Sequence, residues 1–272
     1  NYNLAGSATG RLASSDPNLM NIPIRTEQGR RVRRAFTAGP PEWLLLAADY
    51  SQIELRILAH LSKDLALTKS FEKGEDIHTI TASQMFQVNL EEVTPDMRRM
   101  AKVMNFGVIY GLSAFGVSQQ IGFTMEKGGQ FIDAYFHRYP GVQQYINETK
   151  QKAHTEGYVS TILGRRHYLP DISSPDFNVR QAAERMAVNA PVQGTAAEII
   201  QLAMINIDRW MQEQKLASNM LLQVHDELIF EVPKEELETM KANITSYMSS
   251  AMDLLVPLQV ELKQGKNWGD ME

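Results

Sequence analysis

The sequence contains no cysteine, which excludes disulfides, thiolate catalysis and cysteine-based zinc or iron–sulfur sites. It also lacks any uninterrupted run of about 20 apolar residues, the length that a membrane-spanning helix needs, so we expect no membrane contact. Hydrophobic residues make up 43% of the 272 positions and charged residues 22%, as in ordinary globular proteins. A chain of this length can bury the core of one large domain or of two unequal ones.

The sequence has no excess of positive charge: 32 acidic residues against 27 lysines and arginines give a formal net charge of −5, so bulk attraction to nucleic acid is not expected. The charge is unevenly spread. Ten acidic residues and four lysines lie between 226 and 272, whereas six arginines and two acids lie between 11 and 34. The basic segment is either a nucleic-acid track or a solvated loop, and charge alone favours the loop. Its arginines are Arg11, Arg25, Arg30, Arg31, Arg33 and Arg34.

Strand-like runs near the two ends of the chain enclose a long helical stretch. We expect a strand at 43–48 that ends at Asp49, hairpins within 158–170 and 220–232, and a final strand at 257–264. Helices are expected from Ser51 onward, over most of 63–156, as two helices separated at Pro191 and Gly194, and over 234–252. Because distant strands must pair, the pattern predicts an α+β fold with one sheet and a large helical insertion.

Two aspartates interrupt strand-like runs. Asp49 follows an apolar run, and Asp226 lies at the apparent tip of a hairpin. A buried carboxylate is costly unless it is paired or bound to a metal. The segment 225–227 can also be read as the polar turn of a hairpin, although it contains no glycine or asparagine. From this segment alone, a simple turn and a functional site are equally supported.

If Asp49 and Asp226 point off one sheet, they could share hard cations. Two Mg²⁺ ions about 4 Å apart repel each other by roughly 17 kcal/mol at an effective dielectric of about 20. Two bridging carboxylates together with substrate phosphates can offset this repulsion, which is the arrangement of two-metal phosphoryl transfer. Because Mg²⁺ keeps waters and takes few protein ligands, sparse acids on separate strands suit it.

The segment 94–111 predicts a helix with two different faces, beginning at Thr94 and Pro95. With Arg98 at zero on a helical wheel, Lys102, Phe106 and Tyr110 fall at about 40°, 80° and 120°. This ladder of two cations and two aromatics matches the order of a triphosphate, a sugar and a flat base. Taken alone, an ordinary amphipathic surface helix explains the pattern better. The opposite face is a predicted core stripe of Met97, Met100, Ala101, Met104 and Val108.

Together these segments resemble the family A DNA polymerases, of the bacterial DNA polymerase I type. Three well-separated motifs carry the resemblance: residues 48–56 (ADYSQIELR) and 224–227 (VHDE) are similar to the two palm motifs, and 98–111 to the fingers helix with its Arg-x3-Lys-x3-Phe-x3-Tyr-Gly pattern. Residues 8–12, 17–19 and 189–197 match further family segments in family order. The resemblance implies an antiparallel palm sheet, with palm at 1–62, fingers at 63–156 and palm again at 157–272.

The implied activity is DNA-templated transfer of nucleotides from dNTPs to a primer 3′-OH. The resemblance implies that Asp49, Asp226 and the backbone carbonyl of Tyr50 hold two Mg²⁺ ions. It also implies that Glu227 is an auxiliary acid beside them and that Lys102 is a proton donor to pyrophosphate.

The remaining family positions imply contacts to the nucleotide and to DNA. Arg98, Lys102 and His78 would contact the triphosphate, and Phe106 the sugar. Glu54 would exclude a 2′-OH together with Tyr110, although Glu54 is also the fourth residue of a capping box. Minor-groove contacts near the new base pair would read pair shape rather than sequence. Residues implied to contact primer–template DNA are Arg11, Arg165, Arg166, Arg185, Asn189, Gln193 and His225.

The sequence departs from the family pattern at three positions. Ala13 and Met20 stand where the family usually has Ser and Gln, and His167 where it often has Arg. The family's helical thumb and exonuclease-like domain have no counterpart here, so we expect a monomeric part of a longer polymerase with weak grip on duplex DNA. The implied location is the cytoplasm (nucleoid) of a bacterium, with an organelle as the alternative.

Two other functions are left open. One is a catalytically silent nucleic-acid binder on a polymerase scaffold, which the intact Asp49 and Asp226 disfavour. The other is a two-metal nuclease, which has no need for the ladder from Arg98 to Tyr110. Primer extension and release of mononucleotides distinguish the three.

Overall fold

The computed structural model describes residues 1–4, 6–23, 26–111 and 113–271, and at 108 and 109 it describes the backbone alone. Arg25 of the basic segment, and the side chain of Val108 in the core stripe, lie outside the described residues. The chain forms two compact units. The first, here the sheet unit, comprises residues 1–53, 196–253 and 258–272; the second, the helical unit, comprises 54–195 and 254–257.

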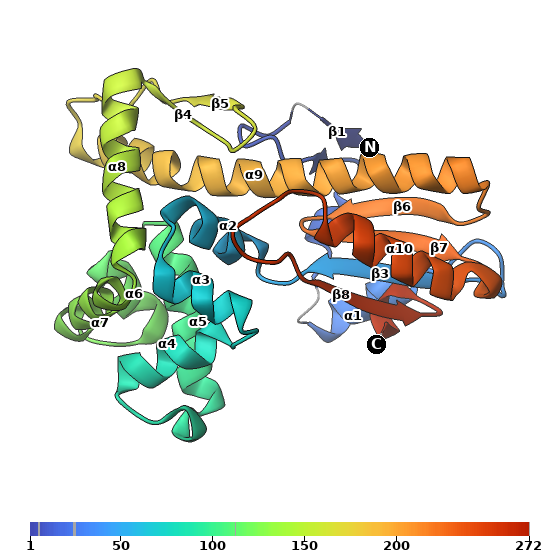
Figure 1. The fold of residues 1–272 in the computed structure, drawn as a ribbon, viewed down its shortest axis with the longest axis horizontal. Helices are drawn as coiled ribbons and strands as arrows, with labels where there is room; N and C mark the ends of the chain where they lie inside the picture. Colours follow the sequence, from blue (N-terminus) through green and yellow to red (C-terminus); the bar gives the residue numbers. More distant parts are fainter. Residues whose placement is uncertain (5, 24–25, 112, 272) are drawn as a thin grey trace. The chain divides into compact units, whose positions relative to one another are not determined.

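A four-stranded antiparallel sheet organises the sheet unit, with the strand order β6-β7-β3-β8 (Figure 1). Its strands are β3 (Leu44–Tyr50), β6 (Asn219–Val224), β7 (Glu227–Val232) and β8 (Val260–Gly265). The unit also contains β1 (Tyr2–Asn3), β2 (Ala13–Ser14), η1 (Leu19–Asn21), α1 (Glu27–Arg34), η3 (Lys234–Glu236), α10 (Leu237–Ser249) and η4 (Trp268–Asp270). Segments from both ends of the chain therefore build one sheet, as predicted.

Both faces of the sheet are covered, which explains its continuous apolar strands. On one face Leu45, Ala47 and Ile229 pack with Trp268 of η4. On the other face, α10 lies against β3 and β8, and the Tyr50 hydroxyl donates to the Met248 carbonyl oxygen over 2.7 Å. Alternate residues of β3 therefore serve two separate cores.

The helical unit contains a series of helices and one small hairpin. They are α2 (Ile53–Ser62), α3 (Leu65–Glu72), α4 (Ile77–Phe86), η2 (Leu90–Glu92), α5 (Pro95–Ile109), α6 (Ala114–Ile121), α7 (Met125–Arg138), α8 (Pro140–Glu156), β4 (Tyr158–Ser160) and β5 (Arg166–Tyr168). The start of α5 at Pro95 and the hairpin within 158–170 confirm the sequence predictions. Ala101 and Met104 are fully buried, whereas Met97 and Met100 are only half-buried, so the predicted core stripe is narrower than expected.

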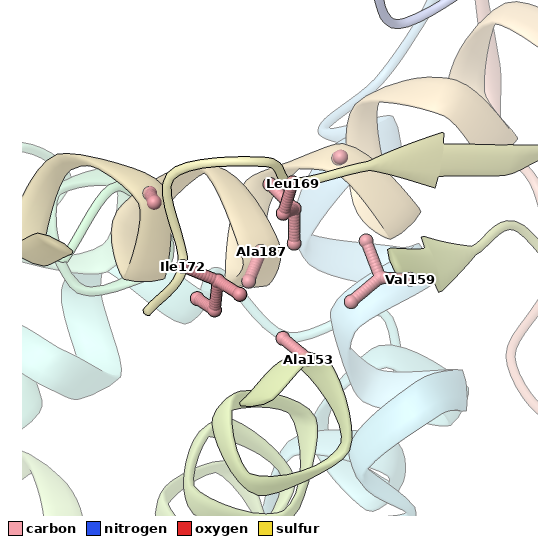
Figure 2. Close-up of a cluster of buried hydrophobic side chains, with 7 residues drawn as sticks. Ala153, Val159, Leu169, Ile172 and Ala187 are labelled. Carbon is pink, nitrogen blue, oxygen red and sulfur yellow. The ribbon is translucent and has the colours of Figure 1, made fainter. Parts of the chain in front are cut away.

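Small side chains allow α8, the β4–β5 hairpin and the following helix to pack closely. Figure 2 shows Ala153 of α8, Val159 of β4, Leu169 and Ile172 meeting Ala187 in one buried cluster. Alanines at the helix positions let the backbones approach, while Leu169 and Ile172 fill the space between them. This packing fixes the hairpin and its arginines on the helical unit.

Helix α9 (Phe177–Gln214) is one unbroken helix of 38 residues with Pro191 inside it. The predicted separation into two helices at Pro191 and Gly194 is therefore wrong. Proline removes one helical hydrogen bond and crowds the preceding turn, at a cost of about 3 kcal/mol. Residues on both sides of it are almost fully buried, including Ala187, Val188 and Val192. Their packing outweighs the local cost, which a sequence pattern does not reveal.

Strand β3 continues to Tyr50, two residues beyond the apolar run predicted at 43–48. Asp49, which was expected to end the strand, lies within it and pairs with residues on both neighbours. Among the described residues, no helix is both long and apolar enough to cross a membrane.

Candidate active-site residues

Three other carboxylates gather around Asp49 in the sheet unit. Asp49 of β3 is paired directly with Glu227 of β7 and with Glu261 of β8, so the three side chains leave the same face of the sheet. The Tyr50 amide donates to the Asp226 carbonyl oxygen over 3.2 Å, which brings the β6–β7 turn beside Asp49. The structure thus brings together acids that lie far apart in the sequence. We call Asp49, Asp226, Glu227 and Glu261 the acid cluster.

The segment that carries Asp226 is a two-residue turn between β6 and β7. His225 begins it in the left-handed region, with φ of 56°, a conformation in which histidine is enriched. The Gln223 side-chain amide donates to the His225 carbonyl oxygen over 2.9 Å, and the Tyr2 hydroxyl binds the Gln223 backbone. The segment 225–227 does form the polar turn of a hairpin. The same turn also places Asp226 in the acid cluster.

Burial and mutual repulsion both disfavour negative charge in the acid cluster. Loss of hydration, followed by the charges of Asp226, Glu227 and Glu261, raises the pKa of Asp49 to about 7, and Lys263 opposes this rise only weakly. Loss of hydration also raises the pKa of Glu227, while Arg33 and Lys263 lower it and Asp226 raises it. The cluster carries more negative charge than its neighbours neutralise. It is therefore a favourable environment for a cation.

The donor atoms of the acid cluster fit a hard cation. Carboxylate and backbone carbonyl oxygens are the ligands of Mg²⁺, which commonly uses one or two protein carboxylates and completes its shell with water and phosphate. Asp49, Asp226 and the carbonyl of Tyr50 supply such oxygens. Within the described ranges, no group of three or more His, Asp or Glu side chains has the geometry to hold an ion.

Arg33 was predicted only as part of a basic segment, and the structure gives it a specific position. Its side chain is buried, with the guanidinium 4.0 Å from the centre of the Trp268 ring and donating to the Ile22 carbonyl oxygen over 3.0 Å. From there its charge lowers the pKa of Glu227. Nothing in the arginine pattern distinguishes this residue from Arg30 or Arg31, because only the tertiary fold buries it.

In the helical unit, α5 carries the predicted ladder. Arg98 and Lys102 are exposed, Phe106 is half-buried, and Tyr110 directly follows the helix with 38% of its surface exposed. The polar ladder and the buried stripe lie on different sides of α5, as the wheel predicts.

Arg98 forms an ion pair with Asp76, with 2.6 Å between Nε and the carboxylate. Asp76 also caps α4 by accepting from the backbone amide of His78 over 3.0 Å, and it accepts from the Thr79 hydroxyl over 2.7 Å. Although burial alone would raise the pKa of Asp76, the hydrogen bonds from Arg98 and Thr79 lower it to about 2. Asp76 is not among the predicted site residues, although its position before an apolar helical run is a typical capping signal.

His78 is buried between α4 and α5, with only 2% of its surface exposed. Its Nδ1 lies 2.9 Å from the side-chain nitrogen of Asn105, and its ring centre lies 5.9 Å from that of Phe106. Burial lowers the pKa of His78 to about 4; Asp76 opposes this shift, whereas Arg98 and Lys102 add to it. The imidazole is therefore neutral at physiological pH.

Glu54 and Tyr110 meet directly. The Tyr110 hydroxyl donates to the Glu54 carboxylate over 2.7 Å, and Glu54 is 6% exposed. Glu54 lies in the first turn of α2, so the same side chain belongs to a helix start and to a contact with the end of α5.

The predicted DNA contacts are spread over several elements. Arg185, Asn189 and Gln193 recur every fourth residue of α9 and therefore share one face of it. Arg165 and Arg166 lie exposed on the β4–β5 hairpin, where the Arg166 guanidinium stacks 4.7 Å from the centre of the Tyr158 ring.

The other two predicted DNA contacts, Arg11 and His225, lie in the sheet unit. His225 is exposed on the β6–β7 turn, and Arg11 is half-buried in the segment before β2.

The chain is similar to known proteins over nearly its whole length. The family model described as DNA polymerase family A matches residues 1–270. The chain is 50% identical over 269 residues to DNA polymerase I of Bacillus caldotenax and 53% identical over 269 residues to that of Pseudomonas aeruginosa. Both matches include 99% of this chain. They include 31% of the Bacillus caldotenax protein and 29% of the Pseudomonas aeruginosa protein. It thus spans about a third of the length of the curated relatives.

A solved structure is also similar. It is titled the POL domain of Pol1 from M. smegmatis in complex with DNA primer-template and dNTP, and it matches with a TM-score of 0.95 and 48% sequence identity. The match covers 98% of this chain and 47% of that one. With a family match over nearly every residue and a shared α+β fold, the chain belongs to DNA polymerase family A.

Proposed function

We propose that this chain is the catalytic core of a DNA-templated DNA polymerase. The reaction joins the primer 3′-oxygen to the α-phosphorus of a dNTP, while the bond between the α- and β-phosphates breaks and pyrophosphate leaves. The observation that carries the proposal is the acid cluster, in which Asp49 lies paired with Glu227 and beside the turn of Asp226. Membership of the family and the similarity to a Pol1 domain support it.

Asp49, Asp226 and the Tyr50 carbonyl are the proposed ligands of two Mg²⁺ ions. When bound, such ions lower the pKa of the 3′-hydroxyl and stabilise the charge of the leaving group. The raised pKa of Asp49 supports this role, because a carboxylate crowded by like charges gains from a cation nearby. Glu227 is the proposed auxiliary acid; burial raises its pKa, and the charges of Arg33 and Lys263 act against this rise.

The ladder of α5 is the proposed triphosphate-binding surface. Arg98 and Lys102 are exposed cations one helical turn apart on one face, so both can reach oxygens of a single triphosphate. Lys102 can also donate a proton to pyrophosphate as it leaves. His78 supplies a neutral donor, since burial keeps its pKa far below 7. Phe106, which packs on His78, offers a flat apolar surface to the sugar.

The pair of Glu54 and Tyr110 is the proposed selector for deoxyribose. A buried carboxylate that already accepts a hydrogen bond has little freedom to move away from an added hydroxyl. The pair therefore excludes a 2′-OH by occupying its space. Tyr110 also offers a half-exposed ring for stacking near the templating base.

Primer–template DNA and a dNTP are the proposed partners, and the protein is proposed to act as a monomer. The face of Arg185, Asn189 and Gln193 carries one cation and two amides, which suit minor-groove acceptors shared by all correct pairs. Arg11, Arg165, Arg166 and His225 are the remaining proposed DNA contacts. A place in the bacterial cytoplasm, at the nucleoid, fits the bacterial relatives, and roles in replication or repair follow from the same chemistry.

Single-nucleotide insertion on a labelled primer–template, with Mg²⁺ and dNTPs, tests the proposal. Asp49→Ala and Asp226→Ala should abolish insertion and leave DNA affinity nearly unchanged. Asp253→Ala, which removes an exposed acid of the same unit, is the matched control and should retain activity. Insertion that survives in either of the first two variants overturns the metal assignment.

The same assay separates the alternatives. Release of mononucleotides from the primer without added dNTP would identify a nuclease. DNA binding without any insertion by the unmodified protein would identify a silent binding module.

A further inference from the structure

Three polar side chains are almost fully buried where α4 packs against α5. His78 and Thr81 come from α4 and Asn105 from α5, and they are 2%, 3% and 0% exposed. Burying polar groups costs free energy unless each finds a partner. They form a chain in which the Thr81 hydroxyl lies 3.0 Å from Asn105 Oδ1, and Asn105 Nδ2 lies 2.9 Å from His78 Nδ1. Such a network holds each member in one orientation.

The direction of these hydrogen bonds determines where His78 carries its proton. The Thr81 hydroxyl donates to Asn105 Oδ1, so the Asn105 amide nitrogen faces His78. An amide nitrogen can only donate, and Nδ1 must therefore accept. A neutral imidazole has a single proton, which is then on Nε2.

We propose that Asn105 is a positioning residue for His78: with Thr81 it holds the imidazole as the Nε2–H tautomer, so that His78 presents one fixed N–H donor to a phosphate oxygen of the incoming nucleotide. This inference rests on the proposed function of the α5 surface. Asn105 itself acts only through His78.

The surroundings of His78 support a neutral donor rather than a cation. Its charged neighbours are Asp76, which favours the imidazolium, and Arg98 and Lys102, which disfavour it. Burial is the largest influence on the pKa of His78, and together with Arg98 and Lys102 it outweighs the effect of Asp76. A phosphate oxygen can accept a hydrogen bond from a neutral N–H. In the other neutral tautomer, the lone pair of Nε2 would face the phosphate and could not donate, so fixing the tautomer avoids this arrangement.

The tautomer can be read directly from protein labelled with ¹⁵N-histidine. Long-range ¹H–¹⁵N correlation distinguishes the two neutral forms, and His78→Gln assigns the signal among the six histidines. The expected result is a protonated Nε2 in the unmodified protein at pH 7.5. In Asn105→Asp the carboxylate must accept from Nδ1–H, so the proton should move to Nδ1 or the ring should gain a second proton. A protonated Nδ1 in the unmodified protein overturns the proposal.

Kinetics supply a second test. At a pH at which the His78 imidazole is neutral, Asn105→Asp should raise the KM for dNTP about tenfold, the effect of losing one hydrogen bond to a charged group. Combined with His78→Gln, it should have almost no further effect, because the residue it positions is already absent. Thr81→Val should produce a smaller rise and Thr81→Ser should restore the parent value. If Asn105 acts on stability alone, Asn105→Asp should lower the melting temperature and leave the KM unchanged, and its effect on stability should add to that of His78→Gln. This outcome also overturns the proposal.

The two proposals fail in different ways. If the protein inserts no nucleotides, the proposed function fails while the tautomer measurement still reports on Asn105. If insertion is normal but the tautomer or the double-variant cycle gives the opposite result, the positioning role alone fails.

Discussion

The Tyr110 hydroxyl donates a hydrogen bond to the Glu54 carboxylate over 2.7 Å, joining the end of α5 to the start of α2. The two residues are 56 positions apart in the sequence. This contact turns two separate motif residues into one rigid pair. It also gives the sugar-selection proposal a specific geometry that can be altered one atom at a time.

Glu54→Ala should increase ribonucleotide insertion relative to deoxyribonucleotide insertion, because it vacates the space of the carboxylate. Tyr110→Phe removes only the hydroxyl, so it should increase ribonucleotide insertion by less than Glu54→Ala does. The expected increase is about tenfold, the effect of losing one hydrogen bond to a charged group. Competition between rNTP and dNTP on a single template position measures both. Tyr168→Phe on an exposed tyrosine is the control. If Glu54→Ala lowers only the melting temperature, Glu54 is merely part of a helix start.

Phe106→Tyr should raise incorporation of dideoxynucleotides, because the added hydroxyl can take the place of the missing 3′-OH beside the sugar. Phe106 is half-buried and packs on His78, and the larger ring should be accommodated without loss of the fold. Competition between ddNTP and dNTP on one template is the measurement. An unchanged ratio, with normal dNTP insertion, contradicts the sugar contact.

Asp49→Asn should raise the melting temperature of the protein in EDTA, because it removes a charge repelled by Asp226, Glu227 and Glu261. Mg²⁺ should stabilise the unmodified protein and stabilise this variant less. Differential scanning fluorimetry with a Mg²⁺ titration measures both effects. Asp253→Asn is the comparison, with no change expected. An equal Mg²⁺ response in Asp49→Asn and the parent would contradict binding at the acid cluster.

The stability of the protein should depend on pH through His78. In the unfolded chain this histidine takes up a proton near pH 6.5, whereas in the fold its pKa is about 4. Between these values the unfolded state holds more protons, so the free energy of unfolding falls as the pH falls through this window, by about 3 kcal/mol at most.

The comparison with His78→Gln isolates this contribution. The advantage of the parent over the variant in urea unfolding should shrink from pH 7 to pH 4. His137→Gln, at an exposed position, should parallel the parent. A constant difference between parent and His78→Gln across the window would mean that folding leaves the pKa of the imidazole unchanged.

Gly111 is expected to control the position of Arg185. It has φ of 67°, and a Cβ built there would lie 2.7 Å from the Arg185 Cγ. Gly111→Ala should therefore cost about 1 kcal/mol in backbone strain and also displace Arg185, weakening primer–template binding. Gly122→Ala is the matched control, since its φ is 81° and nothing lies within 4 Å of its Cβ.

DNA affinity by fluorescence anisotropy separates the two effects of Gly111→Ala. Both glycine variants should lose similar stability, and only Gly111→Ala should weaken binding. In combination with Arg185→Ala it should weaken binding no further. Additive losses would show that Gly111 acts by another route.

The sequence by itself determined the elements whose signals are local. The start of α5 follows from Thr94 and Pro95, its two faces follow from a period of 3.6 residues, and the β4–β5 hairpin follows from Gly164 between short apolar runs. The α+β class could be predicted because strands near both ends have no local partners. The residue types of the acid cluster and the ladder were also identifiable, because their chemistry depends on residue type and spacing.

Only the tertiary structure decided what depends on contacts across the chain. The continuity of α9 through Pro191 comes from burial on both sides of it, which outweighs a local penalty. Arg33 differs from its neighbouring arginines only because Trp268, far away in sequence, covers it. Nothing in the sequence pattern distinguishes Asn105 from other helix residues. Only the packing of α4 against α5 brings it into contact with His78. The physical reason is the same in each case: burial and pairing energies act between residues that only the fold makes neighbours.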